Sequence, residues 1–151
     1  MPNLYPVFEV PTILTRRGAQ AKKQPSFKKS YQFDYSTGDF VRGTANRILF
    51  ADGKEAWKQW CMKTVATQRY ACRAYNGDIG IDRDSLYQIS RRTELENTLS
   101  AEIREALLAD PAGRTAFVSG FAFAWKDDQV SVSFNVLGAE GQSETLQVEI
   151  K

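Results

Sequence analysis

Histidine is absent from this 151-residue chain. Without histidine, a Ser-His-Asp or Cys-His nucleophile system cannot be built, and the commonest zinc sites are excluded as well. Apolar runs are also short, because none approaches the roughly 20 residues that a membrane-spanning helix needs. The N-terminus lacks the charged-then-apolar pattern of a signal sequence. We therefore expect a protein that is made and assembled in the cytoplasm.

Cysteine is scarce too, with only Cys61 and Cys72 in the chain. The two thiols could pair in principle, but a reducing compartment favours free thiols that pack as small apolar side chains. The rest of the composition, with 42% hydrophobic and 25% charged residues, is ordinary for a globular protein. A chain of this length suits one domain with a single modest core.

Acidic residues are nearly missing from the first 30 residues, where Glu9 stands against six lysines and arginines. The net charge of this segment is +5, and because the whole chain carries +2, the remaining residues sum to −3. Prolines and a dense polar run over residues 15–29 leave no sustained helical or strand period. We therefore divide the chain into a basic extended arm, residues 1–29, and a single domain, residues 30–151.

Three uses of this arm are open at this point. Its positive charge could neutralise nucleic-acid phosphates, although it lacks interleaved aromatic residues for base stacking. It could instead lie along a neighbouring subunit, or it could be a solvated tail. In the neighbouring-subunit case the anchors would be its apolar residues: Leu4, Tyr5, Val7, Phe8, Val10, Ile13 and Leu14.

A capped amphipathic helix is predicted to begin just after Asp52. The Asp52 carboxylate can accept a hydrogen bond from a first-turn N–H, and Glu55 three residues later completes a capping box. Residues at helical spacing predict one buried face: Trp57, Trp60, Cys61, Thr64 and Val65. The helix is expected to end at a corner, residues 67–69, and a short strand over residues 70–75 is expected to follow.

A hairpin is predicted before this helix, because aromatic residues alternate with polar ones and a turn then returns the chain. Its aromatic positions are Tyr31, Phe33, Tyr35 and Phe40. A second helix is predicted after it, because Thr93 and Glu96 make another capping box and an apolar stripe runs down to Asp110. That stripe consists of Leu95, Leu99, Ile103, Ala106 and Leu107.

Three strand patterns fill the C-terminal third of the chain. The first has a face of large residues, which are Phe117, Phe121, Phe123 and Trp125. In the other two, apolar residues alternate with polar ones: Val130, Val132, Phe134 and Val136, then Leu146, Val148 and Ile150. The pattern predicts an α+β fold with an N-terminal extended arm and hairpin, two main helices and a C-terminal antiparallel sheet of about three strands.

Four short motifs surround the first predicted helix. They are Asp52-Gly53-Lys54-Glu55-Ala56, Gln59, Thr67-Gln68-Arg69-Tyr70 and Gly80-Ile81. In this order they resemble the sheath-initiator family of contractile phage tails, also labelled lysozyme-like baseplate wedge proteins. The branch that is most similar occurs in prophages and phage-tail-like particles of Gram-positive bacteria. The resemblance runs from about Ser30 to the C-terminus, but more distant relatives carry Glu-Pro-Arg at the corner, where Thr67 and Gln68 precede Arg69 here.

The resemblance implies a structural baseplate component that docks on wedge proteins and templates tail-sheath assembly by offering its C-terminal sheet for strand addition. The wedge-docking corner would be Thr67, Gln68, Arg69 and Tyr70. The sheath-joining strands would be those of Val130, Val132, Phe134, Val136, Leu146, Val148 and Ile150. The implied partners are the sheath and wedge proteins, with tube or hub proteins as further candidates, in a six-fold baseplate of a virion or a phage-tail-like bacteriocin. Neither a nucleic-acid nor a membrane partner is expected.

A peptidoglycan-cleaving, lysozyme-like glycosidase is the enzymatic alternative. It would need two carboxylates roughly 5 to 9.5 Å apart, one of them with a raised pKa. The available acidic residues are Asp52, Glu55, Asp78, Asp82, Asp84, Glu94 and Glu96. Several of these have predicted capping roles, and the acidic loop over residues 78–84 lacks the spacing of a calcium site. We expect no enzymatic activity, no metal site and no cofactor.

Overall fold

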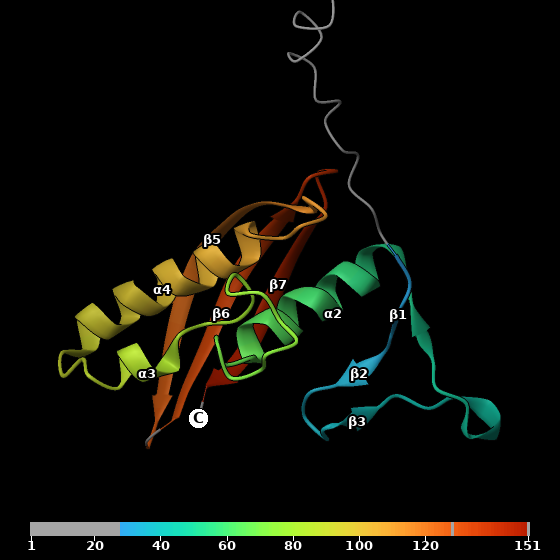
Figure 1. Ribbon diagram of the computed structural model, residues 1–151, viewed down its shortest axis with the longest axis horizontal. Coiled ribbons are helices and arrows are strands. Elements are labelled where there is room, and N and C mark those ends of the chain that lie inside the picture. The colour runs from blue at the N-terminus through green and yellow to red at the C-terminus, as the bar shows by residue number, and fades with distance from the viewer. Residues whose placement is uncertain (1–27, 128, 151) are drawn as a thin grey trace, which may run out of the picture.

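A mixed arrangement of helices and short and long strands is present in the computed structural model, which describes residues 28–127 and 129–150 (Figure 1). In chain order the elements are β1 (Ser30–Tyr31), β2 (Phe33–Asp34), β3 (Asp39–Phe40), the 3-10 helix η2 (Thr44–Asn46), β4 (Phe50–Ala51), α2 (Gly53–Ala66), α3 (Arg83–Leu86), α4 (Arg92–Leu108), β5 (Thr115–Lys126), β6 (Gln129–Gly138) and β7 (Ser143–Ile150). The predicted α+β class is confirmed. Within the described ranges, no helix is long and apolar enough to cross a membrane.

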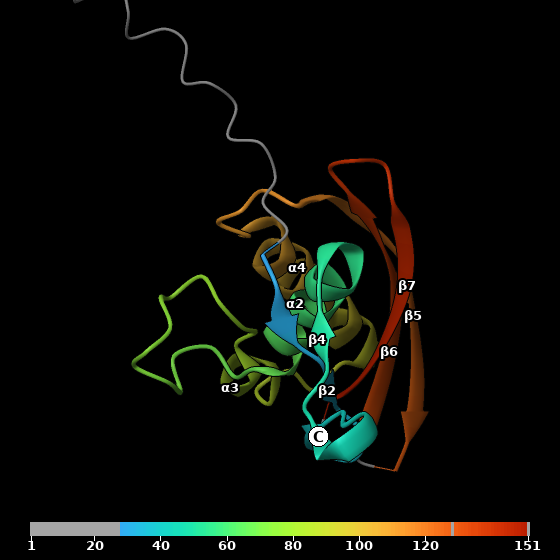
Figure 2. The same ribbon diagram turned by 90° about the vertical axis from the view of Figure 1, so that its right-hand side faces the viewer.

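The largest sheet is an antiparallel meander in the order β5-β6-β7. Helix α4 packs against β5 and helix α2 against β7, so both long helices cover the same face of the sheet (Figure 2). The predicted alternation in the last two strands is confirmed, because the seven apolar residues that define it are buried: Val130, Val132, Phe134, Val136, Leu146, Val148 and Ile150. An antiparallel sheet that is covered on one side needs only one apolar face per strand.

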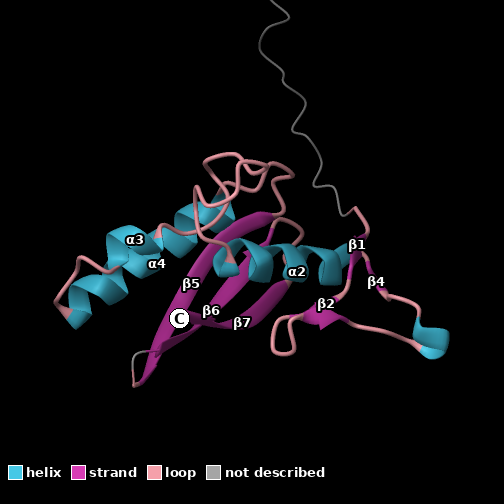
Figure 3. Cartoon of the chain, turned by 60° about the horizontal axis from the view of Figure 1, so that its bottom comes forward, coloured by secondary structure: helices cyan, strands magenta, loops and turns pink. Residues whose placement is uncertain are grey.

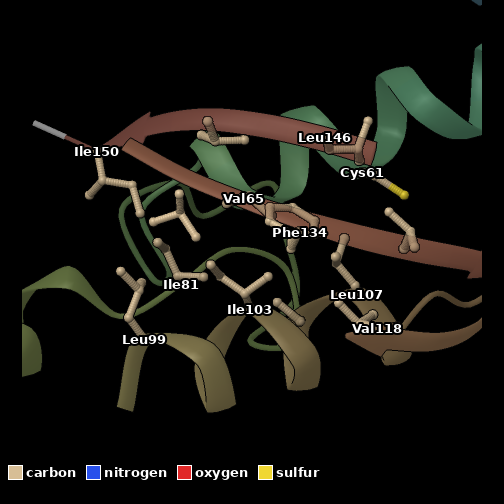
Figure 4. Packing of buried hydrophobic residues seen from close by; sticks show 14 of the residues in the cluster. Cys61, Val65, Ile81, Leu99, Ile103, Leu107, Val118, Phe134, Leu146 and Ile150 are labelled. Atoms are coloured by element: carbon tan, nitrogen blue, oxygen red, sulfur yellow. The ribbon is translucent and has the colours of Figure 1, made fainter. Parts of the chain in front are cut away.

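The core lies between this sheet and the two helices (Figure 4). Helix α2 contributes Cys61 and Val65, and helix α4 contributes Leu99, Ile103 and Leu107. These side chains meet the apolar face of the meander, where a buried residue of this size contributes roughly 1.5–3 kcal/mol. The core also contains Trp57, whose indole N–H donates to the hydroxyl of Thr115 at 3.0 Å, so its one polar group is satisfied.

Strand β5 contains two irregularities that the sequence pattern did not reveal. Its register with β6 shifts between residues 115 and 117 and again between residues 119 and 122, where Gly120 has a φ of 67°. Each bulge reverses the side to which the following side chains point. Val118 is therefore buried while Phe117 is 55% exposed. The prediction that Phe117 shares a face with Phe121, Phe123 and Trp125 was wrong.

The helix positions agree with the predictions, but neither capping box forms among the described residues. Helix α2 begins at Gly53, and this glycine enters the helix with a φ of 52°, which is not the geometry of a capping box. The Glu55 N–H is satisfied by the backbone carbonyl of Asp52 instead, at 3.1 Å. Helix α4 begins at Arg92, two residues before the start that a Thr93 cap requires. Its Glu96 accepts a hydrogen bond from the Trp125 indole at 2.7 Å, so packing against the sheet uses this carboxylate.

The strand predicted over residues 70–75 is wrong, because this segment is a loop. Tyr70 has a φ of 67°, so the backbone leaves the extended region at the first residue of the expected strand. The loop closes where Gln68 and Ile81 form an isolated parallel bridge. We call residues 70–80 the corner loop.

The predicted hairpin is present next to α2. Phe33 of β2 pairs with Phe40 of β3, and after η2 the chain returns so that β4 pairs with β1. The amide of Gln32, between β1 and β2, donates to the carbonyl of Leu49 at 2.9 Å, so the four short strands form one continuous structure. We call residues 30–51 the hairpin segment.

Candidate functional site

The outer edge of β7 is the regular edge of the meander. Strand β6 is central and pairs with β5 on one side and β7 on the other, so its backbone groups are used within the chain. Strand β7 pairs with β6 from Ser143 to Ile150 without a register shift. On its other side, the described part of the chain provides no pairing strand. Such an edge presents N–H and C=O groups that can bind an extended chain.

The structure therefore separates the two groups of residues that the family resemblance assigned to sheath joining. Those of β6, Val130, Val132, Phe134 and Val136, lie on the central strand. Those of β7, Leu146, Val148 and Ile150, lie on the edge strand. All seven side chains are buried, so they build the core. Only the backbone of β7 is placed where another chain could pair with it.

A groove of about 810 Å³ runs beside this edge. Residues 145–149 of β7 form one wall, residues 32–36 of the hairpin segment form the other, and residues of α2 complete the lining. Figure 3 shows β2 and β7 next to α2. Its apolar lining comes from Phe33, Val41, Met62, Leu146 and Val148. Pockets of roughly 300–1,000 Å³ enclose drug-sized ligands, so this groove has room for several residues of an extended peptide.

Gln59 of α2 connects the groove to the hairpin segment. Its side-chain Oε1 accepts the Phe33 N–H at 3.4 Å, and its backbone carbonyl accepts the Tyr35 hydroxyl at 3.1 Å. Burial raises the pKa of Tyr35 to about 12, with Tyr75 adding to the shift, so this hydroxyl keeps its proton at neutral pH. The Phe33 and Tyr35 rings meet edge to face, with centroids 5.0 Å apart.

An ion-pair cluster fixes the start of β7 to α2. Lys54 forms a salt bridge with Glu144, and the ammonium of Lys58 lies 3.9 Å from the same carboxylate. The hydrogen bond from Lys54 lowers the pKa of Glu144, and both lysine charges add to this effect. The carboxylate is therefore ionised over the physiological range. Its ion pairs attach β7 to α2 at this end of the groove.

The opposite edge of the sheet, on β5, is different. Both bulges lie on this strand, and a bulged edge does not offer a regular ladder to another chain. Arg104 of α4 reaches across it, and its Nε donates to the carbonyl of Val118 at 3.4 Å. Its guanidinium also lies over the ring of Phe121, 5.4 Å from the centroid. Both strands are covered by a helix on one face, but a groove lies beside β7.

The predicted docking corner is built around Arg69, which is 8% exposed. Its Nε donates to the carbonyl of Gly80 at 3.0 Å, and its two terminal nitrogens each lie 3.3 Å from a carboxylate, of Glu105 and of Glu102. Gly80 allows this close approach, because a Cβ there would lie 2.7 Å from the carbonyl oxygen of Thr67. Gly80 also has a φ of 96°, which glycine adopts without strain.

The other corner residues have distinct contacts. The Thr67 hydroxyl donates to the carbonyl of Lys63 at 2.7 Å, and Gln68 Oε1 accepts the N–H of Arg83 at 3.1 Å. Arg83 in turn donates to the carbonyl of Ala66 at 2.7 Å, at the end of α2. By contrast, Tyr70 is 72% exposed. The corner therefore buries the guanidinium of Arg69 and exposes the ring of Tyr70.

The acidic residues considered for catalysis are distributed over several elements. Asp52 and Glu55 lie at the start of α2, Asp82 and Asp84 at α3, and Glu94 and Glu96 at the start of α4. Asp78 lies in the corner loop, where one of its oxygens accepts a hydrogen bond from Asn76 at 3.3 Å. In the ranges that the structure describes, no group of three Cys, Asp or Glu residues could hold a metal ion.

The buried ion pair between Asp110 and Arg114 was not predicted from the sequence. Asp110 receives three hydrogen bonds from Arg114: from its backbone N–H at 3.0 Å, from Nε at 2.8 Å and from a terminal nitrogen at 3.0 Å. The Ala112 N–H adds a fourth at 3.0 Å. The Arg114 guanidinium also lies 5.0 Å from the ring centroid of Trp60. The spacing Asp-Pro-x-Gly-Arg was the available signal, since it marks a tight turn that returns a basic side chain.

Both cysteines are free, as predicted, but the expectation that both pack as small apolar side chains was wrong for Cys72. Cys61 is fully buried, and burial raises the pKa of its thiol to about 12. Cys72 is exposed in the corner loop. The predicted arm, with its anchors from Leu4 to Leu14, lies outside the described residues apart from its last two.

The comparison with known families agrees with the order of the motifs. The family model for contractile injection system sheath initiators matches residues 29–141. This match covers well over half of the chain, including the hairpin segment, both long helices, β5, β6 and the corner. No curated protein matches the chain.

Proposed function

The chain belongs to the contractile injection system sheath-initiator family, and from this premise we propose that it templates the first ring of tail sheath by strand addition at β7. A sheath subunit would supply an extended segment to the groove. Backbone hydrogen bonds to β7 would provide affinity, and alternating side-chain contacts would provide register. The observation that carries this proposal is the unbulged outer edge of β7 with a groove along it.

The choice of edge follows from the difference between β5 and β7. Strand β5 has two register shifts, and its Val118 carbonyl already accepts a hydrogen bond from Arg104. Strand β7 has a continuous register over eight residues. A partner strand about five residues long would span roughly 17 Å at 3.4 Å per residue. Residues 145–149 provide a wall of that length.

The same protein would be held in the baseplate through its corner loop. We propose that Tyr70 is the contact with wedge proteins, because exposed aromatic side chains supply much of the energy of protein interfaces. Arg69 supports this contact from inside by bracing the corner. One copy on each wedge of a six-fold baseplate, with tube or hub proteins nearby, completes the proposed assembly.

The glycosidase alternative receives less support from the described carboxylates. A general acid needs a raised pKa, whereas the fold lowers the pKa of Asp110 and Glu144. Hydrogen bonds from the Ser36 side chain and backbone also lower the pKa of Asp34. The nucleic-acid alternative depends on the basic arm, most of which lies outside the described residues.

Hydrogen exchange on a complex with the tail-sheath protein of the same particle would test the function. We expect the outward-pointing amides of residues 145–149 to exchange more slowly in the complex, because they would donate to the added strand. Amides of β5 should be unaffected. Protection on β5 alone, or none on β7 in a complex that forms, would contradict strand addition at this edge.

A further inference from the structure

We propose that the hairpin segment limits strand addition at β7 to one segment, and that Gln59 is the residue that positions this barrier. The inference rests on the strand addition proposed above and concerns how many segments the edge accepts. An open edge normally has no built-in limit, because each added strand presents a new edge of its own. A structure that starts an assembly at a defined point needs such a limit.

The geometry of the groove supplies it. The groove has β7 on one side and residues 32–36 on the other, with Lys58, Gln59 and Met62 of α2 between them. A segment that pairs with β7 would therefore have the hairpin segment next to its outer edge. A second added strand would need the position that the hairpin segment already occupies.

The hairpin wall has few backbone groups left for pairing. The Gln32 N–H donates to the carbonyl of Leu49, and the Gln32 carbonyl accepts the N–H of Val41, both at 2.9 Å. The Asp34 carbonyl accepts the N–H of Gly38 at 2.9 Å. The bound segment would thus meet a ladder on its β7 side and mainly side chains on its hairpin side.

Gln59 satisfies a further donor in this stretch and holds the wall in position. Its Oε1 accepts the Phe33 N–H, the group that would otherwise be free to pair with an added strand. Its carbonyl accepts the Tyr35 hydroxyl two residues later. One residue of the helix therefore fixes two successive inward-facing positions of the wall. Gln59 belongs to the motifs noted in the sequence, and the positioning of this wall gives it a role.

The test compares variants of Gln59 that keep or remove the acceptor. Gln59→Leu removes it, whereas Gln59→Glu retains carboxylate oxygens that can accept the Phe33 N–H. A matched control is Gln88→Leu, because Gln88 is exposed and is not among the residues that line the groove. Tyr35→Phe removes the second contact alone and provides an independent variant if Gln59→Leu does not fold.

Two measurements are needed for each folded variant. Hydrogen exchange at the Phe33 amide reports whether the wall is loosened, and we expect it to be about fivefold to tenfold faster in Gln59→Leu than in the wild type. Native mass spectrometry with purified tail-sheath protein, at concentrations where that protein alone is monomeric, reports how many sheath chains each copy binds.

We expect one sheath chain per copy for the wild type, Gln59→Glu and Gln88→Leu, and more than one for Gln59→Leu or Tyr35→Phe. A Gln59→Leu variant with a loosened wall and still one bound chain would overturn the limit imposed by the hairpin segment. Unchanged exchange at Phe33 would overturn the assignment of Gln59. Failure of the wild type to bind sheath at β7 would instead overturn the proposed function itself.

Discussion

Arg69 and Gly80 meet across the corner, where the Arg69 Nε donates to the Gly80 carbonyl at 3.0 Å. Their contact joins the end of α2 to the segment that enters α3, and the two carboxylates of α4 next to Arg69 extend it to a third helix. The arginine that the motif highlighted thus acts within its own domain. Its effect on assembly would follow from the shape that it gives to the corner.

Replacing Arg69 by alanine should reduce the free energy of unfolding by about 1–3 kcal/mol, because the buried Gly80 carbonyl loses its donor. Arg69→Lys should recover only part of this loss, since an ammonium cannot supply the planar fork that reaches a carbonyl and two carboxylates. Urea denaturation would measure both changes. Arg73→Ala, in the exposed part of the corner loop, is the control and should stay within about 0.5 kcal/mol. Wild-type stability in Arg69→Ala would refute the bracing role.

Replacing Tyr70 by glycine should separate docking from folding. The native φ of 67° costs a tyrosine energy but suits glycine, so we expect unfolding free energy within about 1 kcal/mol of the wild type. Loss of the exposed ring should nevertheless weaken binding to wedge proteins at least tenfold. Co-purification with wedge proteins and thermal unfolding would be measured on the same sample. Unchanged binding would move the docking surface away from Tyr70.

Proline substitutions at Gln147 and Val148 should differ from each other. Neighbouring residues of a strand point their N–H groups to opposite sides, so one proline removes a donor to β6 and the other removes a donor to the groove. The variant that loses only the donor facing the groove should keep more of its stability, yet it should fail to support sheath assembly. Gln147→Ser, which changes only an exposed side chain, should assemble normally. Sheath growth on the groove-side proline variant would exclude β7 as the template.

Acid should weaken the protein partly through Asp110. Burial acts to raise the pKa of this carboxyl, but the hydrogen bonds from the Arg114 side chain and from the Ala112 and Arg114 amides outweigh burial and lower it. The unfolded chain has the ordinary pKa of about 3.9. A lower folded pKa means that the stabilisation is fully present above that value and is lost as the pH falls through the folded pKa.

The measurement is the free energy of unfolding between about pH 6 and pH 2 for the wild type and for Asp110→Asn. The variant should be less stable by about 3 kcal/mol at pH 6, because Arg114 loses its charged partner. The difference between the two proteins should shrink as the pH falls. A difference that stays constant down to pH 2 would show that ionised Asp110 is not the source.

The elements with strong periodicity could be predicted from the sequence, and those fixed by distant contacts could not. The faces of β6 and β7 follow from strict alternation, and the buried stripe of α2 follows from helical spacing. Glu96, in contrast, fits a capping box locally, but Trp125 of β5 takes its carboxylate. The bulges of β5 could not be predicted from the sequence either, because large and small residues alternate regularly along this strand. Gly120 marks one bulge, and no residue type marks the other.

The candidate site was predictable in part for the same reason. Arg69 was identified by its motif, but its partners were not. Gly80 lies 11 positions away in the sequence and Glu105 lies 36 positions away. The groove was not predictable, because Phe33 and Leu146 come from opposite ends of the described chain. Gln59 could be noted as a motif residue, but its contacts with Phe33 and Tyr35 depend on where the hairpin segment packs.

The unequal burial of the two thiols makes this chain selectively reactive without any engineering. A thiol-directed fluorophore at neutral pH should attach to Cys72 alone, because Cys61 is fully enclosed and its pKa is about 12. Cys72 is exposed two positions after Tyr70. A dye there would report on the corner loop by its emission, so the unmodified sequence already contains an attachment point for following incorporation into a baseplate in real time.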